Sequence, residues 1–174
     1  DAVLWVRTDD AAPEPMPVSL FFRSGEELRP IDREALARVR GRVLDGGAGV
    51  GSLALILQER GVPVVAAEII PAGVDIMRER GVREVINAPM EALQPSGAFD
   101  TILLLMNGTA LAGTLRGFSV FLDTLDGLLA PGGQVLVDST DLLGGETWAE
   151  SAGNPGQAGR GFQDPYPGEL HYQM

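Results

Sequence analysis

The stretch VLDGGAGVG, residues 43–51, decides the fold of this chain. It is a short apolar run that ends in an acid and passes into a cluster of glycines, and apolar residues then recur at helical spacing up to Arg60. A strand that ends in a glycine-rich turn and opens a helix is suited to hold a ligand. Glycine allows close backbone approach, and the helix N-terminus offers unpaired N–H groups.

The spacing within this turn bears on the kind of ligand. Gly47, Gly49 and Gly51 form G-x-G-x-G, whereas the dinucleotide fingerprint G-x-G-x-x-G/A needs Gly or Ala at the position that Ser52 occupies. The turn therefore favours a ligand that places no pyrophosphate on the helix terminus. An NAD-type nucleotide-binding domain is the alternative, disfavoured by Ser52 and by the Pro131-Gly132-Gly133 segment.

A second element of the expected site is Glu68, which ends the apolar run Val64–Ala67 and lies 21 residues after Gly47 (68 − 47). A carboxylate at the end of the second strand can accept hydrogen bonds from both hydroxyls of a ribose. The competing interpretation is a solvated acid at a strand end. Because Glu68 is an isolated charge between apolar residues, we favour ribose binding.

Outward from these two elements, strands alternate with helices. This alternation predicts an α/β fold, a Rossmann-like and mostly parallel sheet with helices on both faces. The strand runs are continuously apolar, as expected for strands buried on both sides. The further expected elements are a helix over Pro71–Arg80, strands over 84–87, 101–106 and 134–139, and a long amphipathic helix from Leu115 to Leu129.

Four segments, in order and at proper spacing, resemble the motifs of the class I S-adenosylmethionine-dependent methyltransferases. They are residues 43–51, Glu68, FDTILL at 99–104 and LLAPGGQVLV at 128–137. The resemblance covers roughly residues 42–142. It implies that the chain binds S-adenosylmethionine and transfers its methyl group to an acceptor.

The resemblance also implies where the cofactor lies. Asp45 and the glycine turn would lie beside its methionine part, Glu68 would hold the ribose, and the loop after the third strand would flank the adenine. That loop has Ala88-Pro89 where the family usually has Gly-Asp, so Met90 and Glu91 become the candidates. The expected cofactor-binding residues are Asp45, Gly47, Ala48, Gly49, Gly51, Glu68, Ile69, Met90, Glu91, Met106 and Asn107.

The residues after the fourth strand face the transferred methyl group in this family, and here they begin with Met106 and Asn107. Methyl transfer from a sulfonium is an in-line displacement, which depends on alignment and exclusion of water. The candidate catalytic residues are Asn107, Asp141 and His171. Asn107-Gly108 also fits a simple turn, and the other two also fit structural or solvated roles.

The N-terminal residues 1–41 are expected to form an arm and a capping helix. Residues 1–17, rich in Pro, Ala and Asp, predict a weakly ordered lead-in, and Asp32 is the expected N-cap of a helix over Arg33–Arg40. Phe21–Arg23 would either fold over the cofactor or pack on the sheet as an aromatic plug.

Residues 42–174 are expected to form the cofactor-binding domain, with a loop or lid over 143–168 and a sixth strand over Glu169–Met174. The family's sheet has a further strand beside the fifth, and this chain has no residues for it. We therefore expect incomplete C-terminal strands and an open apolar edge at 134–139. The C-terminal segment would cover that edge, within one chain or between the chains of a homodimer.

Composition narrows the partners. The formal net charge of −11 opposes nucleic-acid binding, and a small-molecule acceptor is expected. With no cysteine and one histidine, no metal site is expected. No apolar run approaches the ~18 residues of a membrane span, and no signal peptide is visible, so a cytoplasmic location is expected. A methyltransferase-like module that binds cofactor or a partner without catalysis is the second alternative.

Overall fold

The computed structural model describes residues 2–8, 11–94, 98–138 and 172–173. The chain divides into a larger compact unit of residues 21–139 and a smaller one of residues 1–20 with 140–174. The predicted cofactor-binding elements that the structure describes all belong to the larger unit. No helix of the described residues is long and apolar enough to cross a bilayer.

Five parallel strands form the sheet of the larger unit, in the order β5-β4-β3-β6-β7. From β3 the chain proceeds to β4 on one side, whereas β6 lies on the other side. The gap outside the carboxyl ends of β3 and β6 is therefore the switch point of the sheet, where open α/β sheets bind ligands. The strands are β3 (Val43–Gly46), β4 (Val64–Glu68), β5 (Val85–Asn87), β6 (Phe99–Leu104) and β7 (Leu129–Val137).

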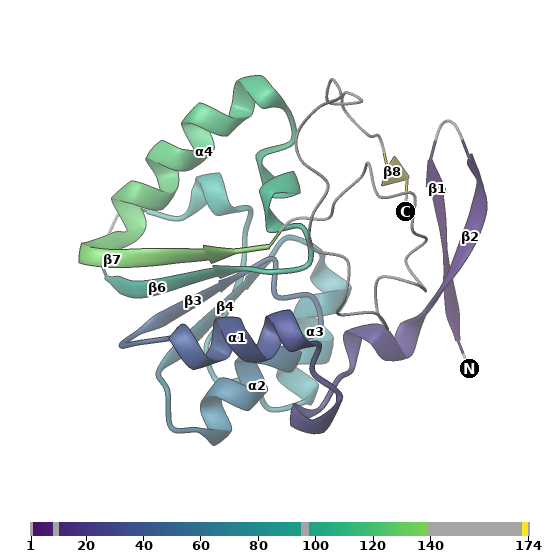
Figure 1. The fold of residues 1–174 in the computed structure, drawn as a ribbon, viewed down its shortest axis with the longest axis horizontal. Helices are drawn as coiled ribbons and strands as arrows, with labels where there is room; N and C mark the ends of the chain where they lie inside the picture. The colour runs from purple at the N-terminus through teal and green to yellow at the C-terminus, as the bar shows by residue number, and fades with distance from the viewer. Residues whose placement is uncertain (1, 9–10, 95–97, 139–171, 174) are drawn as a thin grey trace. The chain divides into compact units, whose positions relative to one another are not determined.

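Helices cover both faces of this sheet (Figure 1). Successive strand residues alternate between two cores, so that Val43 packs with α1, α2 and α3 while Leu44 packs with α4. The predicted fold class is confirmed, and β3, β4 and β6 are the strands buried on both faces, whereas β5 and β7 at the sheet edges are partly exposed. The helices are α1 (Pro30–Arg38), α2 (Ser52–Glu59), α3 (Pro71–Glu79) and α4 (Leu115–Leu128), and the 3₁₀ turns are η1 (Val18–Phe21), η2 (Gly25–Glu27), η3 (Met90–Ala92) and η4 (Gly108–Ala112).

Helix α1 starts earlier than predicted, and Asp32 is not its N-cap. Pro30 opens the helix because its fixed φ suits the first helical position, and Arg29 is the N-cap. Asp32 is the third helical residue, and its carboxylate accepts a hydrogen bond from the Arg29 backbone N–H at 3.2 Å. Asp32 therefore lies inside the first turn of the helix, where it is fully buried.

Two strands also have shifted bounds. The strand predicted over 101–106 is β6 at Phe99–Leu104, so Met106 lies in the turn after it. The strand predicted to begin at Gln134 is β7, which begins at Leu129, directly after α4. Its pairing with β6 shifts register between Phe99 and Thr101, which accommodates the Pro-Gly-Gly segment that sequence analysis interpreted as a turn.

The smaller unit has a three-stranded antiparallel sheet, where a weakly ordered arm was predicted. β1 (Val3–Thr8) pairs with β2 (Ala11–Pro17). The prolines of β2 suggested coil, but β2 is an edge strand, where proline is tolerated. β8 (Tyr172–Gln173) pairs with β1, so the expectation that the C-terminal segment covers the 134–139 edge is wrong for these two residues.

Candidate cofactor site

The glycine turn after β3 combines an open face with a packed one. Gly47, Gly49 and Gly51 have φ values of +68°, +58° and +79°, a region that L-residues rarely adopt. A Cβ on Gly49 would meet no atom within 4 Å, whereas one on Gly51 would lie 2.7 Å from Met77 Cγ of α3. Gly49 therefore borders open space, and Gly51 allows α3 to pack beneath the turn.

Glu68 is held against this turn from the end of β4. The Gly49 N–H donates to Oε2 at 2.8 Å and the Ile70 N–H donates to Oε1 at 2.9 Å. Glu68 is buried, at 7% exposed, so it is not the solvated strand-end acid of the competing interpretation. Each carboxylate oxygen keeps a second acceptor position for a ligand hydroxyl. Ile69 beside it is 57% exposed.

A glycine that sequence analysis did not single out supports the same contact. A Cβ on Gly73 in the first turn of α3 would lie 2.7 Å from the Gly49 carbonyl oxygen and 3.2 Å from Glu68 Cγ. Only glycine allows α3 to approach the turn this closely. The sequence signal was weak, because a glycine two residues after a helix-opening proline has no distinctive pattern.

Asp45, the last acid before the glycines, is buried, and its Oδ2 has no hydrogen-bond partner among the described residues. Burial raises the pKa of this carboxyl to about 7; the Ala54 backbone N–H opposes the rise and the negative charge of Glu68 adds to it. A buried carboxylate with one unpartnered oxygen fits a cationic ligand group. The ammonium of an amino acid is such a group.

The loop after β5 presents its two candidates differently. Met90 is 4% exposed and packs in the α4-side core, and a Cβ on Gly46 would lie 3.0 Å from its sulfur. Glu91, the next residue in η3, is exposed. Met90 therefore packs against the end of β3, whereas the Glu91 side chain is accessible to solvent.

The turn after β6 has an unusual backbone. Met106 and Asn107 both have positive φ, +62° and +64°, which costs of order 1–3 kcal/mol for each non-glycine residue. A Cβ on Gly108 would lie 2.5 Å from Leu104 Cβ, so glycine is required there. The Asn107 N–H donates to Asp138 Oδ1 at 2.8 Å. This turn is thus held by a side chain that follows β7, and it is more constrained than the simple Asn-Gly turn that the sequence allowed.

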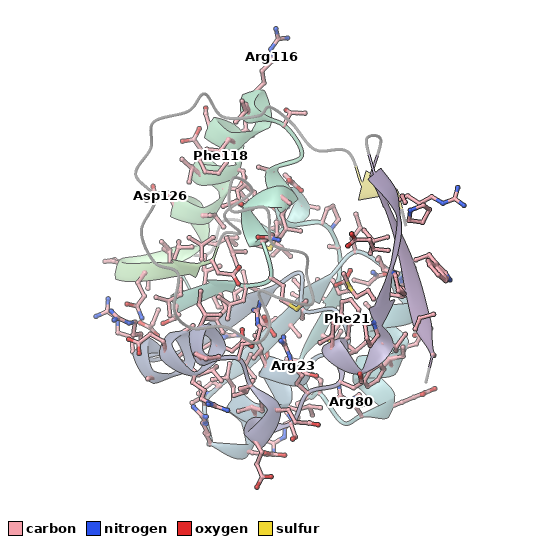
Figure 2. All side chains as sticks on the ribbon, turned by 45° about the vertical axis from the view of Figure 1, so that its right-hand side comes forward. Phe21, Arg23, Arg80, Arg116, Phe118 and Asp126 are labelled. Atoms are coloured by element: carbon pink, nitrogen blue, oxygen red, sulfur yellow. The ribbon has the colours of Figure 1, made fainter. Side chains whose placement is uncertain are left out.

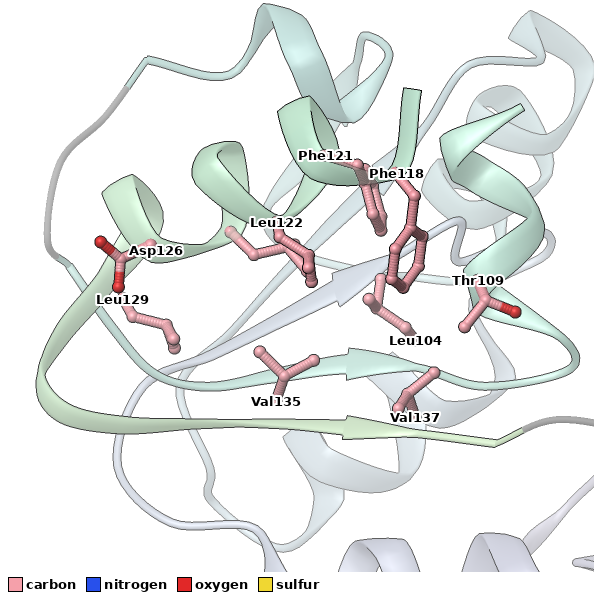
Figure 3. Close-up of a pocket in the computed structure, with 10 residues that line it drawn as sticks. Leu104, Thr109, Phe118, Phe121, Leu122, Asp126, Leu129, Val135 and Val137 are labelled. Atoms are coloured by element: carbon pink, nitrogen blue, oxygen red, sulfur yellow. The ribbon is translucent and has the colours of Figure 1, made fainter. Parts of the chain in front are cut away.

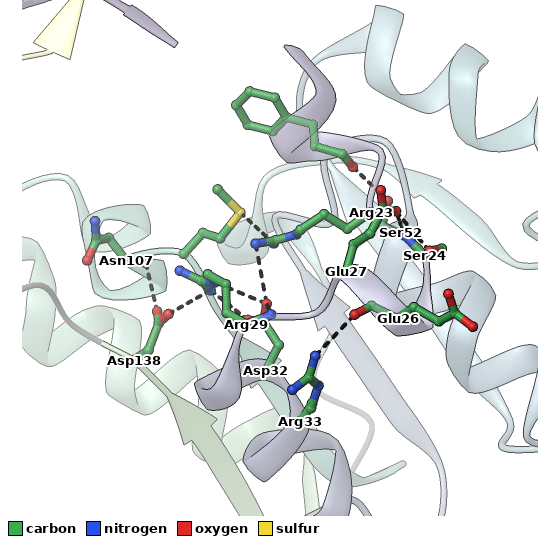
Figure 4. A network of polar contacts seen from close by, with 12 residues as sticks. Arg23, Ser24, Glu26, Glu27, Arg29, Asp32, Arg33, Ser52, Asn107 and Asp138 are labelled. Carbon is green, nitrogen blue, oxygen red and sulfur yellow. Dashed lines mark hydrogen bonds and ion pairs between the residues drawn. The ribbon is translucent and has the colours of Figure 1, made fainter. Parts of the chain in front are cut away.

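Asp138 belongs to a buried cluster of charges that sequence analysis did not assign to the site (Figure 4). Arg29 donates to Asp138 Oδ2 at 3.2 Å and, through two nitrogens, to both oxygens of Asp32 at 2.6 and 3.0 Å. Arg23 forms an ion pair with Asp32 at 3.3 Å and donates to the Met106 sulfur at 3.3 Å. The cluster ties the segment before α1 to the turn after β6 and to Asp138, which follows β7.

Ser52 and Arg80 tie the same segment to the glycine turn. The Ser52 hydroxyl donates to the Phe21 carbonyl at 2.6 Å and accepts from Arg80 at 3.1 Å. Arg80, which is labelled in Figure 2, also donates to the Val50 carbonyl at 2.6 Å and lies 5.1 Å from the Phe22 ring centroid. Ser52, which departs from the dinucleotide fingerprint, therefore anchors the chain that crosses the helix N-terminus.

A separate apolar cavity of about 260 Å³ lies between α4 and the β6–β7 pair (Figure 3). Thr109 and Asp126 are its polar residues, and neither Glu68 nor the glycine turn lines it. It lacks the polar groups that a nucleoside needs, so it is distinct from the candidate cofactor site. Its lining residues are Leu104, Thr109, Phe118, Phe121, Leu122, Leu125, Asp126, Leu129, Val135 and Val137.

Of the remaining predicted residues, the structure describes Ala48 alone. Ala48, between Gly47 and Gly49, donates its N–H to the Ala67 carbonyl at 3.0 Å, which fixes the turn on β4. Asp141, His171 and the loop over 143–168 lie outside the described residues. Within the described ranges, no group of three or more His, Cys, Asp or Glu side chains could hold a metal ion.

Comparison with known proteins identifies the family to which this chain belongs. Residues 22–164 match the family described as a methyltransferase domain. The chain is also similar to a crystal structure of a SAM-dependent methyltransferase from Bacteroides fragilis in complex with S-adenosyl-L-homocysteine. The two are 38% identical, the match covers 81% of this chain and 59% of that chain, and the TM-score is 0.76. The chain belongs to the SAM-dependent methyltransferase family, which confirms the resemblance of the four motifs.

Two further structures share the fold at lower identity. The amino pentose methyltransferase CalS10 from Micromonospora echinaspora is 26% identical, with 62% of this chain and 46% of that chain covered and a TM-score of 0.52. The 1,6-didemethyltoxoflavin-N1-methyltransferase from Burkholderia thailandensis is 22% identical, with 68% of this chain and 53% of that chain covered and a TM-score of 0.53. The chain spans 59% or less of the length of these three structures. No curated protein matches it significantly.

Proposed function

We propose that this protein binds S-adenosylmethionine outside the carboxyl ends of β3 and β4 and transfers its methyl group to a small-molecule acceptor. The observation that carries the proposal is the open Gly49 turn with the Glu68 carboxylate held 2.8 Å from the Gly49 nitrogen. The unpartnered Asp45 oxygen suits the amino end of the same ligand. These groups fit a ligand that carries both a ribose and an amino acid.

Each of the proposed binding residues has a distinct task. Glu68 accepts hydrogen bonds from the ribose hydroxyls through the free lone pairs of its two oxygens. Asp45 faces the ammonium, and the turn with Gly47, Ala48, Gly49 and Gly51 lies along the methionine part. Ile69 and the η3 residues Met90 and Glu91 border the adenine.

The turn after β6 borders the acceptor in this proposal. When bound, the cofactor supplies an electrophilic methyl group on a sulfonium. The chain's own contribution is to fix Met106 and Asn107 in one backbone conformation, through Asp138, so that an acceptor is aligned and water excluded. Asn107 is an amide and orients rather than removes a proton, which leaves Asp141 and His171 as candidate bases.

The acceptor class follows from charge and from the relatives. A net charge of −11 opposes nucleic acid, and two of the similar structures are named as an amino pentose methyltransferase and a 1,6-didemethyltoxoflavin-N1-methyltransferase. We infer a small-molecule acceptor for this chain. We also propose a cytoplasmic location, as the sequence leads us to expect.

Calorimetry tests the proposal against its rivals. We expect micromolar binding of S-adenosylmethionine or S-adenosylhomocysteine and much weaker binding of NAD. Tighter binding of NAD would overturn the methyltransferase assignment. Cofactor binding without methyl transfer to any of a broad panel of small amines, alcohols and acids would favour the non-catalytic module.

A further inference from the structure

The loop between β4 and α3 lies next to Glu68, and its side chains do not anchor it in the core. Ile69 and Ile70 are 57% and 44% exposed. The Ile70 N–H nevertheless points at Oε1 of Glu68, to which it donates at 2.9 Å. The orientation of this loop therefore depends on polar contacts rather than on the packing of its two isoleucines.

Asn87, at the end of β5, supplies such a contact from the neighbouring strand. It lies opposite Glu68 in the parallel pairing of β4 with β5. Its Nδ2 donates to the Glu68 backbone carbonyl at 2.8 Å and to the Ile69 carbonyl at 3.1 Å. One side-chain amide thus holds two consecutive peptide groups of the loop.

The second of these contacts reaches the carboxylate of Glu68 through a single peptide group. The Ile69 carbonyl, which accepts from Asn87, and the Ile70 N–H belong to the same planar unit. Rotation of that unit would break the contacts with Asn87 and with Glu68 together. A hydrogen bond at its carbonyl also polarises the unit and strengthens its N–H as a donor. Because the Gly49 N–H holds Oε2, both carboxylate oxygens are fixed.

We propose that Asn87 is a positioning residue of the cofactor site, which orients the Glu68 carboxylate towards the ribose hydroxyls through the Ile69–Ile70 peptide group. This inference rests on the proposed function, since it requires that Glu68 bind a ribose. Asn87 is itself exposed, so its replacement leaves no cavity in the core. Its effect on the ligand passes through Glu68 and should disappear when that carboxylate is lost.

A double-mutant cycle, measured by calorimetry with S-adenosylhomocysteine, tests this dependence. Asn87→Leu keeps the approximate size of the side chain and removes its donor. We expect the affinity to fall by about 3- to 10-fold, as for one lost hydrogen bond. Glu68→Gln should lower the affinity by about 10- to 100-fold. Adding Asn87→Leu to Glu68→Gln should lower it further by less than about twofold, because the group that Asn87 orients is already gone.

Gln58→Leu is the matched control, because Gln58 is a second side-chain amide that holds a loop. Its Nε2 donates to the Gly81 carbonyl at 3.1 Å, and its Oε1 accepts from the Arg83 N–H at 2.7 Å. That loop precedes β5, whereas Asn87 ends the strand. Gln58→Leu should lower the urea midpoint about as much as Asn87→Leu does and leave the affinity for S-adenosylhomocysteine at the wild-type value.

Three results would overturn the proposal. The first is an unchanged affinity in Asn87→Leu. The second is an equal fall in Gln58→Leu, since loss of stability alone would then explain both. The third is an equal loss from Asn87→Leu in the wild-type and Glu68→Gln backgrounds, which would mean that Asn87 acts without Glu68.

Two further outcomes are separate from these. If Asn87→Leu does not fold, Asn87→Ala takes its place in the cycle, and the same criteria apply. A wild-type chain that binds no S-adenosylhomocysteine would refute the proposed function and this inference with it. That result differs from a cycle in which the wild type binds and the two losses add, which refutes the role of Asn87 alone.

Discussion

Gly49 and Gly61 have similar backbone conformations in different places. Their φ values are +58° and +75°, and a Cβ on either would meet no atom within 4 Å. Gly61 follows helix α2 on the surface, whereas Gly49 borders the proposed cofactor. Alanine at either position adds the same methyl group and the same backbone strain, so the pair separates strain from ligand contact.

We expect Gly49→Ala and Gly61→Ala each to lower the free energy of unfolding by ~1 kcal/mol, the usual cost of a left-handed alanine. Gly49→Ala alone should abolish S-adenosylhomocysteine binding, because its Cβ occupies ligand space. Urea denaturation and calorimetry measure the two effects. Normal affinity in Gly49→Ala would remove the glycine turn from the site.

Asp45 gives the site a pH dependence. Burial raises its pKa from 3.8 to about 7, so the folded state binds the proton more tightly than the unfolded state does. The stability that the neutral carboxyl contributes therefore declines as pH rises from about 4 to 7. Binding of a ligand ammonium favours the ionised form instead. The affinity for S-adenosylhomocysteine should therefore rise towards pH 7, by up to about tenfold per pH unit, and level off above it.

Asp45→Asn should remove this dependence, since the amide does not titrate. The measurement is calorimetry from pH 5.5 to 8.5 on both proteins. An identical pH profile in Asp45→Asn would show that another group titrates and that Asp45 is not beside the ammonium.

At the scale of elements, local patterns were sufficient for the sheet and insufficient for the charge cluster. The strands at 43–46 and 64–68 were predictable because each is an apolar run bounded by glycine or an acid. The site residues Gly49 and Glu68 follow from the ends of those strands. Arg29 and Asp138 are 109 residues apart in sequence, and nothing local distinguishes them from solvated surface charges.

The N-terminal strands were missed for a different reason. The prolines of β2 oppose a central strand, and only the pairing with β1 shows that β2 lies at an edge. Asp32 was misplaced because Pro30 and Arg29, two weaker signals, together set the helix start. Long-range pairing therefore decides that β2 is a strand, whereas the start of α1 is set locally.

The contact between Asp138 and the turn after β6 is an element-scale device that mutation can test. Asp138 is 7% exposed and accepts hydrogen bonds from the Asn107 N–H and from Arg29. Asp138→Ala removes both contacts and should lower the free energy of unfolding by ~2–4 kcal/mol, as for one partner lost from a buried pair. Glu34→Ala, in an exposed pair with Arg38, is the control and should cost less than ~0.5 kcal/mol.

Urea denaturation of Asp138→Ala and Glu34→Ala measures the difference. Equal, small losses in the two variants would mean that the left-handed conformations of Met106 and Asn107 are stable without Asp138.

For the larger unit as a whole, the sheet edge at β7 is the feature with consequences for association. Among the described strands β7 pairs with β6 alone, and the apolar cavity between it and α4 opens beside it. Exposed apolar residues surround this region, with Leu122 at 48% and Val137 at 49%. An edge with an apolar face is a template for pairing with another chain.

We expect this 174-residue chain to associate with itself through β7 and the neighbouring apolar cavity. The net charge of −11 opposes association at low ionic strength, so light scattering should show a mass that increases with protein concentration and with added salt. Val137→Lys places a charge on the cavity wall and should keep the chain monomeric. Leu115→Lys is the matched control, because Leu115 is 74% exposed and does not line the cavity; it should associate as the wild type does. Since both variants change the net charge by the same amount, a difference between them reports the location of the contact rather than the charge. A wild-type chain that stays monomeric at high concentration and high salt would show that this edge is not an association surface.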